Sequence, residues 1–240
     1  MIAAARIGSL LLLFVLCVPP HLVTKAIFGR SGWRRRFLSA AAWLCGARVK
    51  VTGKPLASHS LLICNHTSWL DIPVLGGATG CAFVSKDTLG HPLIHWMADQ
   101  GHTLYVRREH RRGAAHQAEA IARKLGEPKP LALFPEGTTG PGTHMLPFRS
   151  TLFSAVAPPP PGAVVRPVAI DYGEAAPEFG WHGERGKDNF LRTLGRRRST
   201  PIVVRLLDPL PAMQDRKALA EAARDAIAAA LTFSPPPTRL

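Results

Sequence analysis

The sequence is short of acidic residues and of paired cysteines. Only 16 Asp and Glu residues stand against 30 Lys and Arg residues, so the formal net charge is +14 at pH 7. A balance this basic indicates an anionic partner, which can be nucleic acid, an acidic membrane surface or a phosphorylated substrate. Cys17, Cys45, Cys64 and Cys81 lie in apolar sequence without metal-ligand or redox spacing. This usage is typical of small buried or membrane residues in a reducing compartment.

Several common functional motifs are missing as well. The sequence has no Walker phosphate-binding loop, no Rossmann glycine fingerprint and no G-x-S-x-G nucleophile elbow. Its histidines are scattered without matching carboxylates or cysteines, so we predict no metal site. The arginine clusters lack interleaved aromatic residues for base stacking, which argues against nucleic-acid binding. A non-catalytic basic module that binds membranes or nucleic acid stays as an alternative, and salt-sensitive DNA binding would favour it.

Two apolar segments lie near the N-terminus. Residues Ile7 to Thr24 carry no formal charge; a basic turn with Arg30 and Arg34–Arg36 follows, and then the apolar segment Phe37 to Val49. We expect residues 1–49 to form a two-helix membrane-associated element whose arginines lie at anionic headgroups on the cytoplasmic side. The alternatives are a signal peptide and a soluble helical hairpin that covers a sheet.

From residue 50 onward, short strand-like runs alternate with helical stretches. The expected strands are 61–64, 81–85, 103–106, 131–134, 164–170 and 202–207; the expected helices are 70–76, 92–99, 111–125, 151–157, 189–194 and 214–231. This alternation predicts an α/β domain at residues 50–233, with a mostly parallel central sheet and helices on both faces. Residues 234–240 form a Pro-rich tail, which we expect to be frayed.

The stretch Asn65-His66-Thr67-Ser68-Trp69-Leu70-Asp71 carries the main chemical signal. An apolar run precedes it and a helix-like run follows it, so His66 should lie at the end of a strand, where α/β proteins place their sites. If Asp71 lies in the first helical turn, its carboxylate can hold one imidazole nitrogen as N–H and leave the other as a base. Ser68-x-x-Asp71 also fits a helix-capping box, in which case His66 is an ordinary loop residue.

Other polar groups should reach the same edge of the sheet. Glu136 lies in the glycine-rich loop Phe134 to Gly140, which follows a strand. Arg107 follows another strand and begins an arginine pair that can clamp a phosphate, and Lys86 follows a third. Parallel strands would bring these groups to His66. The alternatives are a plain turn around Glu136 and a solvated run of charges after Arg107.

These stretches together resemble the glycerolipid acyltransferase family, in particular bacterial 1-acyl-sn-glycerol-3-phosphate acyltransferases. Asn65–Asp71 is similar to the His-x4-Asp block of the family, and Gly101–Arg107 is similar to its second block. Phe134–Thr138 is similar to the third block and Val165–Val168 to the fourth. The four blocks occur in the right order, so the resemblance covers the middle of the chain.

The resemblance implies roles for individual residues. His66 would be the general base and Asp71 its orienting partner. The residues implied for substrate binding are Lys86, Arg107, Glu136, Gly137, Thr138 and Arg149. Two positions depart from the family pattern, since Val106 stands where many members have Asp, and Arg149 where many have Lys. These departures leave the acceptor open.

The resemblance also implies a reaction and its setting. As a 1-acylglycerol-3-phosphate O-acyltransferase, the protein would move a fatty acyl group from acyl-CoA or acyl carrier protein to the free hydroxyl of 1-acylglycerol-3-phosphate, giving phosphatidic acid. No metal or bound cofactor would be needed, because the thioester is already activated. A lyso-ornithine lipid is the alternative acceptor. The implied partners are a lysophospholipid, the acyl donor and an anionic membrane surface but no nucleic acid, and the implied location is the cytoplasmic face of a bacterial inner membrane.

Overall fold

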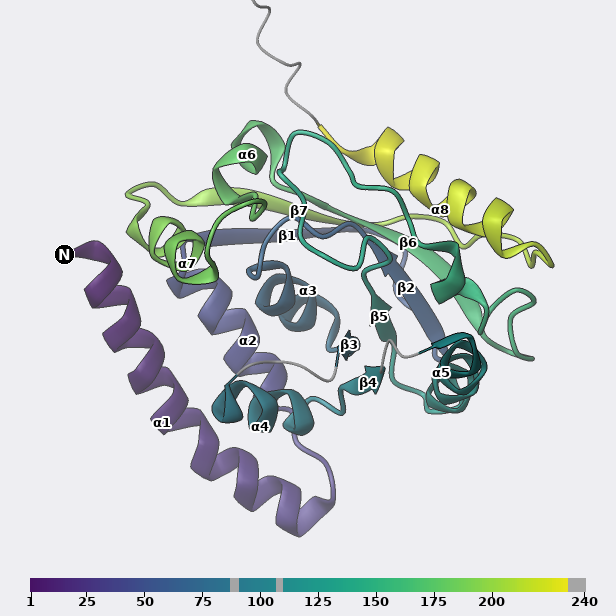
Figure 1. Ribbon diagram of the computed structural model, residues 1–240. Helices are drawn as coiled ribbons and strands as arrows, with labels where there is room; N and C mark the ends of the chain where they lie inside the picture. The colour runs from purple at the N-terminus through teal and green to yellow at the C-terminus, as the bar shows by residue number, and fades with distance from the viewer. Residues whose placement is uncertain (87–90, 107–109, 233–240) are drawn as a thin grey trace, which may run out of the picture.

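Seven short strands form the central sheet of the computed structural model, which describes residues 1–86, 91–106 and 110–232. The strands are β1 (Ala47–Gly53), β2 (Ser60–Cys64), β3 (Ala82–Lys86), β4 (Leu104–Val106), β5 (Leu131–Leu133), β6 (Val164–Asp171) and β7 (Thr200–Leu206). Their spatial order is β1-β7-β6-β2-β5-β3-β4 (Figure 1). Neighbouring strands are parallel except β6 and β7, which are antiparallel. The predicted mostly parallel sheet is therefore confirmed.

Helices cover both faces of this sheet, as the alternating pattern predicted. In the described residues they are α1 (Ile2–Phe28), α2 (Trp33–Leu44), α3 (Asp71–Thr79), α4 (Pro92–Gln100), α5 (His110–Leu125), α6 (Ala176–Phe179), α7 (Gly186–Gly195) and α8 (Arg216–Ala230), with 3-10 turns at Ser150–Phe153 and Gly173–Ala175. The buried side chains of α2, α3 and α7 pack on one face of the sheet, and those of α5 and α8 pack on the other (Figure 1).

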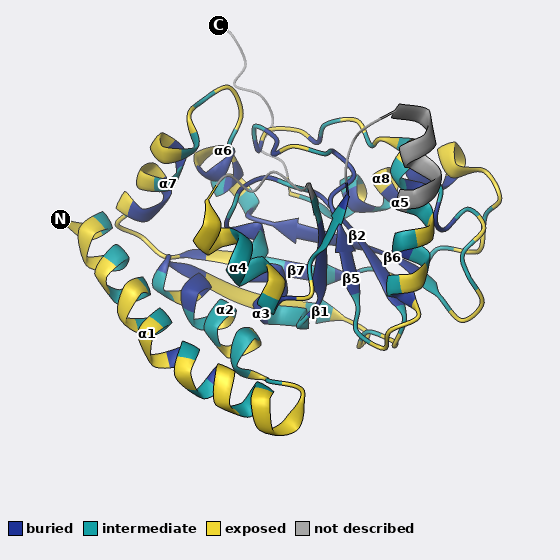
Figure 2. Cartoon of the chain, turned by 60° about the horizontal axis from the view of Figure 1, so that its bottom comes forward, coloured by how far each residue is buried: buried dark blue, intermediate teal, exposed yellow. Residues whose placement is uncertain are grey.

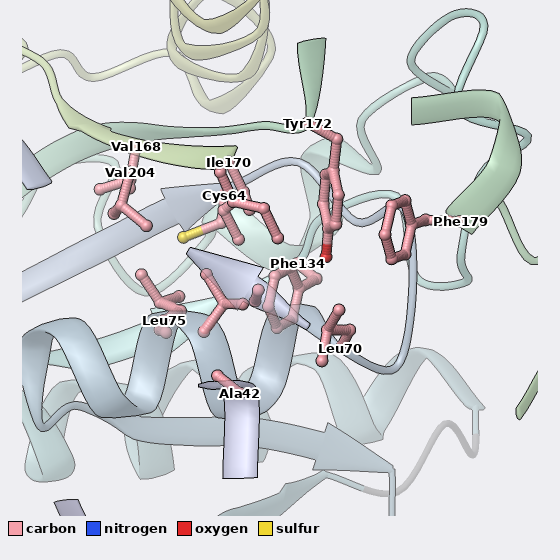
Figure 3. Packing of buried hydrophobic residues seen from close by; sticks show 14 of the residues in the cluster. Ala42, Cys64, Leu70, Leu75, Phe134, Val168, Ile170, Tyr172, Phe179 and Val204 are labelled. Atoms are coloured by element: carbon pink, nitrogen blue, oxygen red, sulfur yellow. The ribbon is translucent and has the colours of Figure 1, made fainter. Parts of the chain in front are cut away.

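Side-chain alternation along β2 divides the core into two layers. Leu62 and Cys64 belong to the layer beneath α3, whereas Leu61 and Ile63 belong to the layer beneath α5 and α8. Figure 3 shows Cys64 in the first layer, with Leu75 of α3 on the opposite side of the packed cluster. All of β2 is buried, because a central strand covered on both faces leaves no side chain in solvent. This strand delivers the chain to the stretch that holds His66.

The N-terminal region contains a strand that the sequence analysis missed. The second apolar segment was expected to run to Val49, but α2 ends at Leu44 and β1 begins at Ala47. β1 pairs in parallel with β7 at the edge of the sheet and leaves most of its side chains exposed. An edge strand with Arg48 and Lys50 among its residues lacks the apolar run that identified the buried strands. The expected helix at 151–157 is also wrong, since only a 3-10 turn forms there.

Helix α1 lies on the outside of the domain. Of its residues, only Cys17 and His21 are buried, whereas Leu12 is 60% exposed and Val15 is 63% exposed. Figure 2 shows exposed residues along much of its length. Among the described helices, α1 alone is long and apolar enough to cross a membrane, judged by length and composition. The helix continues through Pro19-Pro20 to Phe28.

Two arginines of the basic turn bond to backbone carbonyls of the protein. Arg34 Nη2 donates hydrogen bonds to the carbonyl oxygens of Gly80 (2.8 Å) and Cys81 (2.6 Å). Arg35 Nε donates to the carbonyl oxygen of Gly77 at 3.0 Å. These carbonyls lie at the C-terminal end of α3, where a helix has unpaired acceptors and the negative end of its dipole. These bonds attach α2 to α3, and the expectation that the arginines of this turn lie at anionic headgroups stays a prediction.

Candidate active site

The turn between β2 and α3 leaves the sheet at Asn65. The buried Asn65 side chain bonds to Ile170 of β6 twice: Nδ2 donates to the carbonyl oxygen (3.1 Å), and Oδ1 accepts from the N–H (2.8 Å). These bonds extend the contact between β2 and β6 beyond the last paired residues of β2. The starting point of the turn is therefore held by the central strands.

His66 and Asp71 meet across this turn. His66 Nδ1 lies 2.8 Å from Asp71 Oδ2; the Asp71 side chain is entirely buried, and the His66 side chain is 18% exposed. The imidazole stacks on Phe134, with ring centroids 4.1 Å apart. Within the described residues, His66 Nε2 has no hydrogen-bond partner. The geometry matches the pairing expected from the five-residue spacing, and the catalytic role of the pair stays a prediction.

The Asp71 carboxylate also holds the backbone of the turn. Oδ2 accepts hydrogen bonds from the N–H groups of Thr67 (2.7 Å) and Ser68 (2.9 Å), and Oδ1 accepts one from the Tyr172 hydroxyl (2.6 Å). Four donors thus replace the water that this buried carboxylate has lost. The two interpretations of the sequence are compatible, because the carboxylate binds the backbone near the start of α3 and orients His66 with the same oxygen atom.

Glu136 lies in the tight turn after β5. Gly137 closes this turn by donating from its N–H to the carbonyl oxygen of Phe134 (3.1 Å), with a φ of 73° that favours glycine. Glu136 Oε1 accepts from the N–H of His66 (2.6 Å), and Oε2 accepts from the N–H of Leu146 (2.9 Å). Burial raises the pKa of Glu136 to about 7, against the opposing effect of these two N–H groups. Both carboxylate oxygens are therefore occupied by the protein itself.

The same loop holds the other side of the His66 backbone. Gly140 N–H donates to the carbonyl oxygen of His66 at 2.7 Å. Trp181 N–H donates to the carbonyl oxygens of Thr67 and Gly140, each at 3.1 Å. The loop after β5 therefore binds both polar backbone groups of His66, which fixes the position of the histidine from outside its own turn.

The other predicted site residues are placed less closely. Thr138 is exposed on the loop after β5, and Arg149 is exposed with its N–H bonded to the carbonyl oxygen of Pro135 (3.0 Å). The Lys86 backbone ends β3, but its side chain lies outside the described part of the structure. Arg107 also lies outside the described residues. Their roles in binding an acceptor therefore stay predictions.

A cavity opens beside the turn. Its lining includes His66, Glu136, Gly140, Tyr172 and Thr232. Among the described residues, no group of three or more His, Cys, Asp or Glu side chains is arranged to hold a metal ion. The ionisable groups that line this cavity are thus two imidazoles (His66 and His144), two carboxylates (Glu136 and Asp171) and the Tyr172 phenol.

Tyr172 and Trp181 are the site residues that the sequence analysis missed. Tyr172 is 101 residues from Asp71, so no local spacing could have linked them. It follows β6 directly, which places it beyond the end of the fourth sequence block. Only the return of β6 beside β2 brings the two side chains together.

Comparisons with known proteins show which family the chain is similar to. A family model described as Acyltransferase matches residues 48–171. The chain is 32% identical over 209 residues to a lyso-ornithine lipid O-acyltransferase of Pseudomonas aeruginosa, covering 82% of this chain and 79% of the relative. It is 30% identical to a 1-acyl-sn-glycerol-3-phosphate acyltransferase of Neisseria gonorrhoeae, over 50% of this chain and 48% of the relative.

A solved structure extends the comparison to the fold. The 1-acyl-sn-glycerophosphate acyltransferase PlsC of Thermotoga maritima superposes with a TM-score of 0.63 over 96% of each chain, at 19% identity. At this identity the likeness shows a shared fold. The family model covers more than half of the chain, and the Pseudomonas relative matches along most of its length. The chain therefore belongs to the glycerolipid acyltransferase family.

Proposed function

We propose that this acyltransferase acylates the free hydroxyl of a lyso-ornithine lipid. The observation that carries acyl transfer is the His66–Asp71 pair, held by buried contacts with one imidazole nitrogen left unpaired in the described residues. The choice of acceptor rests on how much of the chain each relative matches. The lyso-ornithine lipid enzyme of P. aeruginosa matches along about four fifths of both chains, whereas the match to the N. gonorrhoeae enzyme covers about half of each chain. This reverses the order of acceptors expected from the sequence motifs.

The proposed mechanism uses both ends of the imidazole. Asp71 accepts the Nδ1 proton of His66, which leaves Nε2 unprotonated and able to act as a base. Nε2 takes the proton of the acceptor hydroxyl as the oxygen attacks the thioester carbonyl. Asp71 stabilises the imidazolium that forms. The tetrahedral intermediate then collapses with cleavage of the carbon–sulfur bond, and the thiolate takes the proton back from His66. The products are an ester and a free thiol.

We propose that α1 keeps the enzyme at the membrane that contains its lipid acceptor. The helix has 27 residues and presents exposed leucines and valines along its length. A helix of this length spans about 40 Å, enough to cross a bilayer or to lie in one leaflet. The cytoplasmic face of the bacterial inner membrane is the proposed location, because acyl-CoA and acyl carrier protein are cytoplasmic donors.

A second acceptor, 1-acylglycerol-3-phosphate, is supported by the N. gonorrhoeae relative and by the shared fold with PlsC. The two acceptors differ in a phosphate monoester, which Arg107 and Lys86 are proposed to bind. Arg107→Ala should therefore raise the KM for 1-acylglycerol-3-phosphate strongly and the KM for a lyso-ornithine lipid much less. Measuring both KM values in the wild type and in Arg107→Ala therefore distinguishes the two proposed acceptors.

The test is thiol release from acyl-CoA by the purified full-length protein in detergent. The assay is run with lyso-ornithine lipid, with 1-acylglycerol-3-phosphate and with no acceptor, and the lipid product is identified by mass spectrometry. Acceptor-dependent release with lyso-ornithine lipid, together with the ornithine lipid product, supports the proposal. Release only with 1-acylglycerol-3-phosphate overturns the proposed acceptor and keeps the mechanism. If neither acceptor gives thiol release with acyl-CoA, the assay is repeated with acyl carrier protein as the donor. Absence of product there as well overturns both proposed acceptors.

A further inference from the structure

The two oxygen atoms of the Asp71 carboxylate have different surroundings. Oδ2 accepts three hydrogen bonds, from His66 Nδ1 and from the N–H groups of Thr67 and Ser68. Oδ1 accepts one, from the Tyr172 hydroxyl at 2.6 Å, and no other described residue donates to it. The Tyr172 hydroxyl is therefore the described group that holds Oδ1, and it influences how the negative charge of Asp71 is divided between Oδ1 and Oδ2.

Tyr172 is itself firmly placed. It follows β6 directly, its side chain is buried, and its ring lies against Phe179 with centroids 4.8 Å apart. Figure 3 shows the ring beside Phe179, with the hydroxyl oxygen pointing toward Phe134 and Leu70. Burial, with the nearby Asp71 charge, raises the pKa of the Tyr172 phenol well above its usual value. The hydroxyl thus keeps its proton and remains a donor to Asp71.

We infer that Tyr172 is a positioning residue for the proposed acyl transfer, acting on His66 through Asp71. Its hydrogen bond sets the rotation of the carboxylate, so that Oδ2 faces the imidazole. It also draws negative charge toward Oδ1, which reduces the stabilisation that Oδ2 gives to the imidazolium. Both effects tune how readily His66 gives up the proton that it takes. This inference rests on the proposed base role of His66.

The other ionisable groups around this chain of contacts differ in their effect. Among the described residues, Cys64 of β2 interacts with Asp71, and Cys45 after α2 interacts with Tyr172. Burial raises the pKa of both thiols, that of Cys45 to about 11, so they are neutral near pH 7. Glu136 faces both His66 and Asp71 and changes charge near pH 7. Comparisons between variants must therefore keep Glu136 unchanged.

The chain offers a matched control, since it has two tyrosines. Tyr105 of β4 also donates to a carboxylate, that of Asp99 on α4, at 2.7 Å. Tyr105→Phe and Tyr172→Phe therefore remove the same kind of hydrogen bond, one of them away from the His66 turn. Tyr172→Phe keeps the ring that packs on Phe179. The difference between the two variants isolates the contact with Asp71.

The first readout needs no turnover. The protonation midpoint of the His66 imidazole is followed by NMR in the free, full-length protein, with the signal assigned from a His66→Gln variant. Tyr172→Phe should raise the midpoint by about half a pH unit or more, because more carboxylate charge then faces the imidazolium. Tyr105→Phe should leave it unchanged. An unchanged midpoint in Tyr172→Phe, or an equal shift in both variants, would overturn the inference.

The second readout is the kinetic profile. In Tyr172→Phe, kcat should fall about ten- to a hundredfold, the range of a hydrogen bond to a charged group, because the carboxylate loses the contact that sets its rotation; the KM for donor and acceptor should be nearly unchanged. The acidic limb of the kcat/KM profile should move to higher pH together with the NMR midpoint. A loss confined to KM would contradict a positioning role. If the wild type acylates none of the acceptors, the proposed function fails, while the NMR comparison still decides this inference.

A third variant keeps the inference testable if Tyr172→Phe does not fold. In the Tyr105→Phe background, growth on 3-fluorotyrosine places the fluorinated ring at position 172 alone. The more acidic phenol is a stronger donor, so the His66 midpoint should move downward, opposite to the expected effect of Tyr172→Phe. An upward shift or no shift would contradict the proposed coupling.

Discussion

Glu136 accepts a hydrogen bond of 2.6 Å from the backbone N–H of His66, seventy residues before it in the chain. Its second oxygen binds Leu146 N–H, so one buried side chain joins the His66 turn to both ends of the loop after β5. The sequence motifs assign this glutamate to the acceptor. Its contacts instead support a role in holding His66, and the acceptor role stays untested.

Glu136→Gln should therefore lower turnover. An amide presents one acceptor oxygen where the carboxylate presents two, so either the N–H of His66 or that of Leu146 faces an NH2 group. A buried donor left without a partner costs about 1–3 kcal/mol. We expect this change in the contacts of the His66 turn to appear as a fall in kcat larger than any rise in acceptor KM. A variant with wild-type kcat and raised KM would instead favour direct acceptor binding.

The same substitution should change how stability depends on pH. The pKa of Glu136 is about 7 in the folded protein, against an ordinary value of 4.5. Between these values the folded protein holds a proton that the unfolded chain has lost. The stability from this group is therefore complete below about pH 4.5 and is lost as the pH rises through about 7. Relative to Glu136→Gln, the wild type should lose up to about 3 kcal/mol across this range. The measurement is the free energy of unfolding of both proteins against pH, and parallel curves for the wild type and Glu136→Gln would contradict this prediction.

Local spacing was enough to predict the His66–Asp71 contact, because the two residues lie five apart across a single turn between a strand and a helix. The buried strands could also be predicted from the sequence, since apolar runs such as Leu61 to Cys64 identify them. Tyr172 was out of reach because its partner is 101 residues away, and β1 because an edge strand needs no apolar run. The inward direction of Glu136 depends on two N–H groups that only the folded loop presents.

The arginines at the start of α2 give a prediction about stability. Arg34 bonds to two carbonyls beyond the end of α3, whereas the neighbouring Arg36 is exposed, with its guanidinium 5.1 Å from the centre of the Trp33 ring. Arg34→Gln should lower the free energy of unfolding by about 1–3 kcal/mol. Arg36→Gln should cost less than about 1 kcal/mol, as expected of an exposed cation–π contact. Equal effects in urea denaturation would show that the attachment to α3 contributes little.

The close approach of α2 and α3 explains why this attachment forms. A Cβ atom on Gly77 would lie 2.7 Å from the Ser39 backbone nitrogen, so the two helices touch where glycine has no side chain. This contact brings the start of α2 to the C-terminal carbonyls of α3, the helix that begins with Asp71. A basic run in sequence looks like a solvated surface, and only the helix packing reveals that two of its members bond to carbonyls at the end of α3.

The exposed face of α1 gives a prediction about membrane binding. Leu12 and Val15 are exposed, so the double variant Leu12→Glu, Val15→Glu should fold as the wild type does. It should float poorly with vesicles of phosphatidylethanolamine and phosphatidylglycerol, because charges within an apolar helix oppose insertion by a few kcal/mol. Val51→Glu, on the exposed part of β1, is the control and should float as the wild type does. Unchanged flotation of the double variant would rule out α1 as the anchor.

The most direct test of the account is the turnover of His66→Ala with lyso-ornithine lipid and acyl-CoA. His59→Asn is the matched control: His59 is also a half-buried loop histidine, bonded through Nδ1 to the carbonyl oxygen of Leu125 (2.8 Å), and its φ of 59° suits asparagine. We predict that His66→Ala folds, binds vesicles and forms no ornithine lipid above background, while His59→Asn keeps wild-type turnover. Substantial acceptor-dependent product from His66→Ala would contradict the assignment of His66 as the base.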